Sequence, residues 1–475
     1  MNFAGYAYIT QVMVLAEIVV ILFVYKHKPV WAIYAILLSI FLKGQYIWLG
    51  RPIYAWQIAA LLGLVFLITG RSKNNMLRPG KALAYYRLSM QVFFIYSFLI
   101  SIPFWLIFSA ENLGGVGTQV SVSRVITQTV YFGFLLGMFG IGLWAGRFLT
   151  AVNLLRGVIF IATILAYVAI VQSLLVRFVG VNIFPIIGSD GTERSAYIMQ
   201  LVFRASSFAG EPKHLGILMS VGLIYCYLAR LMRIPIGRQF TIHKPLAMGI
   251  ALLLSLSTTG FALSAVGIGV ASVIFFRRIR SLDIALAGIA FAVLVTQVIG
   301  AGGDYATSLL AQLNRMEIEV QDQSVRQGLL HHPGLLFAGT GLGNIHLFAV
   351  DFLPAEFPLF RDQGYKANSG LWFIIGSTGL IGMFLLLIGP VFGGQGSLQM
   401  RRSLSQEQCR EALTTLAIVL VTTVSFLLRF DVLIFLISGF AVTRLAVLRT
   451  ETIGGLKGSS QGHNSPTASG GVLTT

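Results

Sequence analysis

Four ionisable side chains lie within the eleven residues from Arg204 to His214, and their types fit the binding of an anion. Pro212 predicts that a helix begins there, because proline is favoured at the first helical position. Glu211 then stands immediately before the helix, and Lys213 lies in its first turn. A helix N-terminus beside cations is a natural anion site, since its free N–H groups carry partial positive charge. We therefore predict that Arg204, Lys213 and His214 bind an anionic group.

The same residues have a structural alternative if they lie at a membrane surface. Arg204 and Lys213 would then extend their charged ends to lipid headgroups, and Glu211 would only cap the helix. Ionisable groups near a membrane are costly and mark functional sites, so a carboxylate, two cations and an imidazole together favour a function. Glu211 is our first candidate for a group that accepts a proton.

A second polar group runs from Arg326 to His332. We predict that Arg326 binds an anion, and the alternative is an ion pair with Asp322 in the same segment. His331 and His332 are adjacent, and adjacent helix positions point about 100° apart, so we expect no metal site there. His332 is our second candidate for accepting a proton.

Three glycines follow this group, at Gly339, Gly341 and Gly343. Nucleotide-binding glycine motifs follow a strand and open a helix, and no strand is predicted before this run. We predict a tight turn that returns the chain to the membrane, because glycine adopts backbone conformations that are closed to other residues.

A third group of polar residues comes directly before the apolar segment that opens at Gly370. Arg361, Lys366 and Asn368 are its candidate ligands for an anionic or sugar substrate. The alternative is a basic and aromatic belt at the membrane interface, which anchors many spanning helices.

The composition predicts a membrane protein. Hydrophobic residues make up 56% of the chain and charged residues 11%, whereas a soluble domain carries about 25% charged residues. We expect an all-α, polytopic integral membrane protein with about 12–14 transmembrane helices, since a span needs about 20 mainly apolar residues. The candidate segments are 6–25, 30–49, 52–70, 88–108, 125–146, 157–178, 214–229, 246–259, 261–276, 284–302, 370–396, 411–428 and 432–448.

The Lys and Arg residues indicate which side of the membrane each loop occupies. Most of the 34 lie in short clusters after alternate apolar segments, and cytoplasmic loops carry such an excess. The loops 179–213 and 303–369 then lie on the periplasmic side and carry the candidate site. Residues 1–453 form one transmembrane domain, and the Gly/Ser/Thr-rich segment 454–475 is predicted to be a disordered cytoplasmic tail. The net charge of +17 reflects these clusters and contact with anionic lipid, so we expect no nucleic acid partner.

The order of these features resembles the bacterial O-antigen polymerase and O-antigen ligase superfamily over roughly residues 195–400. The shared features are a periplasmic Arg before a helix, an Arg-containing loop, a Pro, a Gly-x-Gly-x-Gly turn and an Asn beside the re-entering span. The stretch 257–262 lies where that family often has a Ser-Arg-Gly turn, and this chain has no Arg there. From the residues alone, the polar stretch 257–260 indicates a tight hairpin or a broken helix, with simple helix packing as the alternative.

The resemblance implies an inverting glycosyl transfer at the periplasmic face of the bacterial inner membrane. The implied donor is an oligosaccharide on polyprenyl diphosphate, with no nucleotide sugar, metal or other cofactor. Arg204 and Arg326 match the family's diphosphate-binding arginines. A flippase, a chain-length regulator and membrane lipid are the implied partners.

One departure from the family favours a polymerase. Ligases of this family carry a His immediately before the Asn of the third motif, where this chain has Ala367, and alanine cannot move a proton. A ligase nevertheless stays an alternative, and so does a transporter of lipid-linked glycan. Transporters place ionisable residues near the middle of the membrane, and Glu17 and Lys43 are the candidates within predicted spans.

Overall fold

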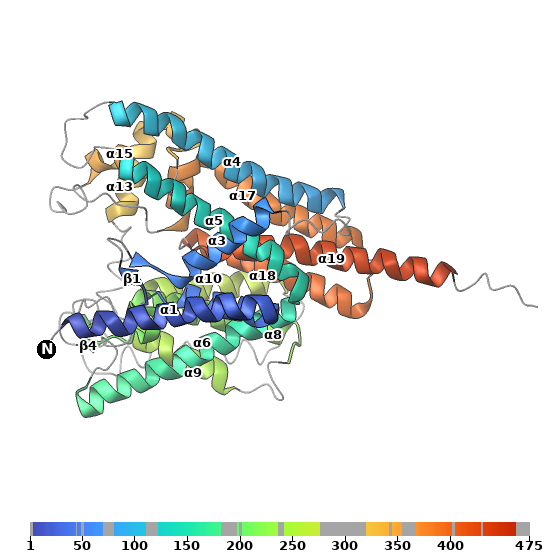
Figure 1. Cartoon of the computed structure of the whole chain (residues 1–475), viewed down its shortest axis with the longest axis horizontal. Helices are drawn as coiled ribbons and strands as arrows, with labels where there is room; N and C mark the ends of the chain where they lie inside the picture. Colours follow the sequence, from blue (N-terminus) through green and yellow to red (C-terminus); the bar gives the residue numbers. More distant parts are fainter. Residues whose placement is uncertain are drawn as a thin grey trace, which may run out of the picture.

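The computed structural model is a bundle of helices whose apolar segments lie roughly side by side (Figure 1). It describes residues 3–43, 45–48, 52–69, 80–110, 122–181, 197–198, 202–235, 242–275, 320–341, 344–353, 367, 369–400, 404–428 and 431–461. The predicted span 284–302 lies outside these residues. Helices coincide with the other predicted spans: α1 (Phe3–His27), α2 (Pro29–Phe41), α3 (Ala55–Ile68), α4 (Lys81–Ala110), α5 (Val122–Phe148), α6 (Ala151–Leu174), α8 (Pro212–Leu231), α9 (His243–Ser255), α10 (Thr258–Ile274), α17 (Gly370–Met400), α18 (Gln406–Leu428) and α19 (Leu433–Gln461).

The helices establish an all-α, multi-pass membrane protein. Among the described residues, eight helices are long and apolar enough to cross a membrane, and α2, α3 and α10 are shorter apolar helices. Large apolar side chains face outward along them, as in α6, where Phe160 is 60% exposed and Val171 50% exposed. Such surfaces suit a lipid environment, because the hydrocarbon of a bilayer is as apolar as the side chains that face it.

The connecting segments add short elements. Two pairs of two-residue strands are antiparallel: β1 (Ile47–Trp48) pairs with β2 (Pro52–Ile53), and β3 (Tyr197–Ile198) pairs with β4 (Val202–Phe203). The other elements are the π-helix η1 (Leu175–Val179), the 3-10 helices η3 (Ser207–Ala209) and η5 (Val350–Phe352), and the helices α13 (Val320–His331), α14 (Pro333–Ala338) and α15 (Ile345–Ala349). The loop predicted at 303–369 therefore contains ordered helices.

Several predicted boundaries were wrong. The span predicted at 30–49 ends at Phe41, because the chain leaves the helix at Leu42 and then pairs β1 with β2. By contrast, the polar stretch predicted as a tight hairpin or a broken helix is indeed a tight turn between α9 and α10, in which Leu256 has a φ of 47° and Ser257 caps α10 by accepting a hydrogen bond from Gly260 N. Helix α19 continues to Gln461, past the predicted start of the tail at 454, since no proline interrupts that stretch.

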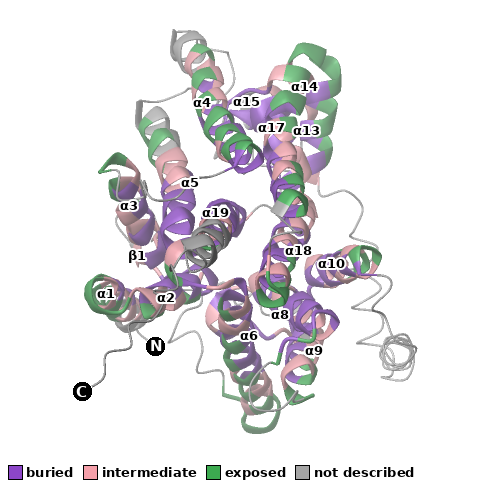
Figure 2. Cartoon of the chain, turned by 90° about the vertical axis from the view of Figure 1, so that its right-hand side faces the viewer, coloured by how far each residue is buried: buried purple, intermediate pink, exposed green. Residues whose placement is uncertain are grey.

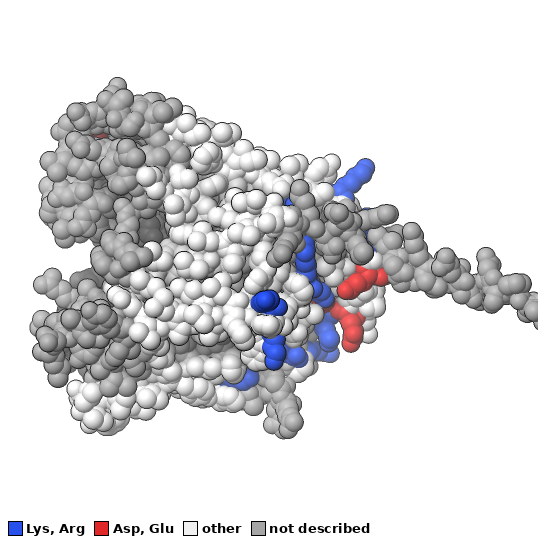
Figure 3. All heavy atoms as spheres, viewed as in Figure 1, with Lys and Arg blue, Asp and Glu red and all other residues white. Residues whose placement is uncertain are grey.

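The clustered basic residues meet at one end of the bundle, which we call the basic end. Arg156 donates a hydrogen bond to the Pro235 carbonyl at 3.0 Å, and so joins the start of α6 to the segment after α8. On the face shown in Figure 3, the described Lys and Arg side chains gather where α19 leaves the bundle. Helix α1 begins at the opposite end, which we call the far end, and β1, β4 and α13 also lie there (Figure 1).

Helix α5 lies between α3 and α19 at the centre of one half of the bundle (Figure 2). Glycines allow the close approach on both sides. A Cβ atom at Gly137 would lie 2.0 Å from the Ala60 carbonyl oxygen, and one at Gly142 would lie 2.1 Å from that of Leu436. Small residues let helix backbones touch, which is the main source of helix association where lipid removes the hydrophobic driving force.

A buried ion pair joins three helices near the basic end. One carboxylate oxygen of Glu411, in α18, accepts hydrogen bonds from Arg444 Nε of α19 at 2.9 Å and from Ala151 N of α6 at 2.5 Å. The two side chains are only 10% and 11% exposed. The carboxylate thus satisfies both the guanidinium and one of the free N–H groups at the start of α6.

The glycine run inserts into a break in α17. Gly379 interrupts that helix with a φ of 65° and a ψ of −174°, which removes the normal partners of nearby carbonyls. Thr340 N donates to the Gly376 carbonyl at 3.0 Å, and Gly341 N donates to the Ser377 carbonyl at 2.8 Å. The predicted tight turn is confirmed at Gly339 and Gly341, which both have positive φ, and it also supplies hydrogen bonds that the broken helix lacks.

Replacing Gly379 tests this insertion. A Cβ atom there would lie 2.0 Å from the Phe337 carbonyl oxygen, in a backbone conformation that alanine adopts poorly. We expect Gly379→Ala to lower the free energy of unfolding by about 1–3 kcal/mol, measured as a lower thermal unfolding midpoint in detergent. The control is Gly394→Ala in the same helix, where a Cβ atom meets nothing within 4 Å. A Gly379→Ala protein as stable as that control would contradict the interpretation.

Removing the charge of Glu411 tests the buried ion pair. Glu411→Gln leaves the Arg444 guanidinium without its counter-charge in a buried position, so we expect a loss of about 3–5 kcal/mol in unfolding free energy. Thermal unfolding in detergent measures the effect. Glu407→Gln, at an exposed position of the same helix, should leave the midpoint unchanged, and equal midpoints for the two variants would show that the pair is dispensable.

Candidate functional site

The segment before α8 is held rigidly by a buried glutamine. Gln172 of α6 is 1% exposed, and its Oε1 accepts hydrogen bonds from Ser206 N at 3.0 Å and Ser207 N at 2.8 Å. Ser207 has a φ of 51°, and Gly210 has a φ of 81°. These constraints position Glu211 at the N-cap of α8, with Pro212 as the first helical residue, as predicted.

Arg204 contacts the end of another helix. Its Nε donates to the Ser255 carbonyl at 3.1 Å, and its Nη2 lies 3.4 Å from the Leu256 carbonyl, so it caps the C-terminus of α9. A cation suits that position, because the last carbonyls of a helix carry partial negative charge. Burial lowers the pKa of the Arg204 guanidinium, and the nearby Glu211 carboxylate opposes this shift. The guanidinium has further N–H groups with which it could bind a ligand.

Glu211 and His214 face each other one helical turn apart. The distance from His214 Nδ1 to Glu211 Oε2 is 3.8 Å, and the side chains are 24% and 44% exposed respectively. Neither charge is buried, and the Glu211 side chain does not cap α8. The carboxylate is therefore available to orient the imidazole and to stabilise it when protonated. Lys213, beside them, is partly buried.

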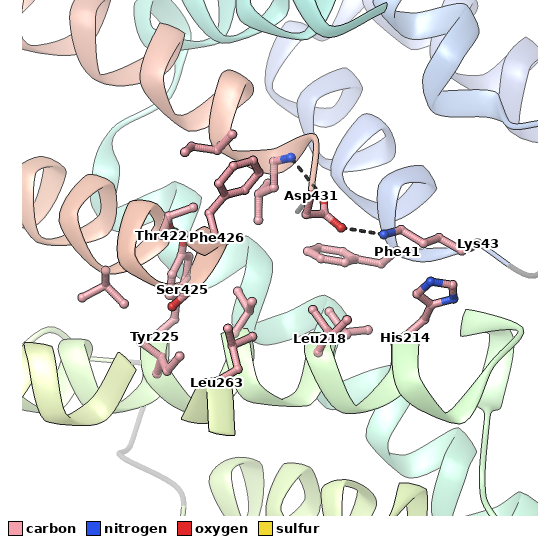
Figure 4. A pocket seen from close by; sticks show the side chains of 16 residues that line it. Phe41, Lys43, His214, Leu218, Tyr225, Leu263, Thr422, Ser425, Phe426 and Asp431 are labelled. Atoms are coloured by element: carbon pink, nitrogen blue, oxygen red, sulfur yellow. Dashed lines mark hydrogen bonds and ion pairs between the residues drawn. The ribbon is translucent and has the colours of Figure 1, made fainter. Parts of the chain in front are cut away.

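A crevice begins beside His214 and runs between α8, α10 and α18. Its free space is about 40 Å³, and its walls are mostly apolar, with Leu218, Leu263 and Phe426 among them. We call the end beside His214 its mouth. Figure 4 shows Lys43, His214 and Asp431 together at one end of the crevice, and Tyr225 with Thr422 and Ser425 at the other. The hydroxyl groups of Tyr225 and Thr422 lie 3.1 Å apart and bond to each other. The crevice is thus apolar along its length, and its mouth carries ionisable groups.

The ion pair at this mouth was not predicted from the sequence. Lys43 Nζ lies 2.5 Å from Asp431 Oδ2, although 388 residues separate the two in the chain. Lys43 was predicted inside a membrane span and considered only for a transporter, and the structure places it after the end of α2 at the far end of the bundle. Asp431 stands in the short turn between α18 and α19, and no local motif marks it. The available signal was that Lys43 places a charge within a predicted apolar span.

Arg326 and His332 lie on a separate layer of helices. Among the described residues, no ion pair joins Arg326 to Asp322, so that alternative was wrong. Asp322 is buried and accepts a hydrogen bond from Ser369 N at 3.1 Å, just before α17 begins. Arg326 and His332 are exposed. The crevice takes no lining residue from α13 or α14, and Figure 2 shows these helices beside α17 and apart from α8.

The layer of α13, α14 and α15 is fastened to α4 and α17. Tyr96 of α4 donates to the Ala338 carbonyl at 2.6 Å, and the Phe104 and Phe348 rings lie 5.4 Å apart. The rings of His331 and His332 pack on different phenylalanines. In the described part of the chain, no three His, Cys, Asp or Glu side chains are grouped as metal ligands would be.

The third predicted group is described only at one position. Arg361, Lys366 and Asn368 lie outside the described residues. Ala367 is 2% exposed. A buried methyl group offers neither a proton acceptor nor a hydrogen-bond donor to a substrate.

The described residues thus establish a multi-pass membrane protein that carries an apolar crevice with Lys43, His214 and Asp431 at its mouth. No protein-family model matches the chain, and no curated protein matches its sequence.

Proposed function

We propose that this protein is a membrane glycosyltransferase that polymerises polyprenyl-diphosphate-linked oligosaccharide repeats into O-antigen or exopolysaccharide. The proposal places it in the bacterial inner membrane, with the far end of the bundle facing the periplasm. The crevice is the observation that carries the proposal. It is apolar along its length and has ionisable groups at its mouth, as a substrate with a lipid tail and an anionic sugar headgroup requires.

The charges near the mouth suit a diphosphate. Arg204, Lys213 and Lys43 bring three cations to the far end of the bundle, where the positive end of the α8 dipole also lies. When the bond between sugar and diphosphate breaks, negative charge grows on the phosphate oxygens. Cations close to those oxygens stabilise the developing charge.

The proposed reaction is a single displacement that inverts the anomeric carbon. A hydroxyl oxygen of the acceptor glycan bonds to the anomeric carbon of the donor, and the bond from that carbon to the diphosphate oxygen breaks. The electron pair leaves with the diphosphate, and the hydroxyl proton passes to a base. We assign the base to His214, which lines the crevice, and give Glu211, predicted earlier as the base, the role of orienting its imidazole.

Arg326 and His332 lie apart from the crevice, so the proposal gives them contact with the part of the substrate that extends beyond it. Arg326 is exposed on α13. In the proposal this residue, together with Arg361, Lys366 and Asn368, binds the glycan or the diphosphate from the side of the loop 303–369. His332 stays the second candidate for the base.

A polymerase, a ligase and a transporter would all bind the same lipid-linked glycan, and they differ in what becomes of it. Purified protein in lipid vesicles is incubated with a polyprenyl-diphosphate-linked repeat unit, without nucleotide or metal, and the glycans are separated on a gel. A polymerase yields a ladder of repeat multiples that Arg326→Ala weakens. Transfer only to an added lipid or protein acceptor would instead indicate a ligase, and movement of intact substrate across the vesicle membrane would indicate a transporter.

The same assay tests the proton acceptor. We expect His214→Ala to slow ladder formation by about 10²–10⁴-fold, the usual contribution of general base catalysis, and Glu211→Gln to slow it less, because the imidazole remains. His243→Ala is the control, since that exposed histidine opens α9 at the basic end. If His214→Ala polymerises at the normal rate while His332→Ala does not, the base is His332 and our assignment is wrong.

A further inference from the structure

The ion pair between Lys43 and Asp431 lies at the mouth of the crevice and belongs to none of the groups predicted from the sequence. Lys43 Nζ lies 2.5 Å from Asp431 Oδ2, and the side chains are 26% and 19% exposed. His214 lies beside them on the same mouth (Figure 4). Any headgroup that enters the crevice from the far end must pass these three side chains.

Asp431 also has a local partner that does not depend on Lys43. Asp431 Oδ1 accepts a hydrogen bond from Leu433 N at 3.1 Å, and so caps the start of α19. Lys43 follows the end of α2, where a cation is favoured by the partial negative charge of the last carbonyls. A partly exposed ion pair contributes little to stability, so the pair is free to exchange partners.

We propose that Lys43 is the cation that binds a phosphate group of the lipid-linked substrate, and that Asp431 holds it while the crevice is empty. The proposal rests on the function proposed above and names a further binding residue of that site. The two linked phosphate groups of the substrate carry one negative charge each and together offer more acceptor oxygens than a carboxylate, so the diphosphate displaces Asp431 Oδ2 from the ammonium. No covalent bond changes in this exchange.

The exchange has a consequence that a purely structural pair would lack. The Asp431 carboxylate repels the incoming phosphate, because like charges a few ångströms apart oppose each other. Asp431→Asn removes that charge but keeps an oxygen that accepts the hydrogen bond from Leu433 N. Removal of the carboxylate is therefore expected to strengthen binding, whereas removal of the ammonium weakens it.

The experiment measures binding of farnesyl diphosphate to the full-length protein in nanodiscs, with farnesol and inorganic diphosphate as comparison ligands. We expect Lys43→Gln to weaken binding of farnesyl diphosphate about tenfold, as for loss of one hydrogen bond to a charged group. Asp431→Asn should tighten it a few-fold. Lys28→Gln is the matched control, because Lys28 is exposed at the opposite end of the same helix, and it should bind like the unchanged protein. Farnesol should bind weakly and equally to all variants.

The inference is overturned if Lys43→Gln binds farnesyl diphosphate as tightly as the unchanged protein. It is also overturned if Asp431→Asn weakens binding as much as Lys43→Gln does, with both proteins folded by thermal unfolding, because the pair would then be structural. Inorganic diphosphate that binds as tightly as the farnesyl compound would overturn the lipid-linked source of the phosphate.

The vesicle assay separates this inference from the proposed function. A ladder that forms normally in Lys43→Gln would refute the role of Lys43 and leave the polymerase standing. Binding that depends on Lys43, without any ladder in the unchanged protein, would support the role of Lys43 and refute the polymerase.

Discussion

Backbone N–H and C=O groups inside a membrane protein must find partners within the protein, because lipid supplies none. The bundle meets that demand where α17 is interrupted. The break in α17 at Gly379 is satisfied by Thr340 and Gly341, which donate to the carbonyls of Gly376 and Ser377. The irregular backbone is thereby buried against protein, and the layer of α13, α14 and α15 is fixed in place.

Backbone groups around the candidate site also find their partners within the protein. Gln172 accepts hydrogen bonds from two consecutive N–H groups before α8, and Arg204 donates to the carbonyls at the end of α9. The start of α8 and the end of α9 are therefore locked together at the far end of the bundle. These hydrogen bonds fix the backbone that carries Glu211 and His214, so the side chains that act on the substrate in our proposal are held in place.

Two ion pairs connect the last part of the chain to earlier helices. They differ in how far they are buried, and this difference suits them to different roles. Glu411 and Arg444 are about one-tenth exposed, and one carboxylate oxygen accepts hydrogen bonds from both a guanidinium and a backbone N–H. A pair of that kind is costly to break. Lys43 and Asp431 are about twice as exposed and face an open crevice, where solvent weakens the attraction. The Glu411–Arg444 pair is therefore suited to holding helices together, and the Lys43–Asp431 pair is suited to exchanging partners.

The sequence by itself determined the features that depend on residues close together in the chain. Apolar runs of sufficient length predicted the helices, Pro212 predicted the start of α8, and the spacing of Glu211 and His214 brought them onto one face, because positions three apart on a helix are neighbours. Helix ends were less predictable where a hairpin or strand pair competed with the apolar run, as at Phe41. Only the tertiary structure decided that Lys43 meets Asp431, that Arg204 caps α9 and that Arg326 lies apart from the crevice. These outcomes depend on how whole helices pack, and the packing is the sum of many weak contacts between segments that are distant in the sequence.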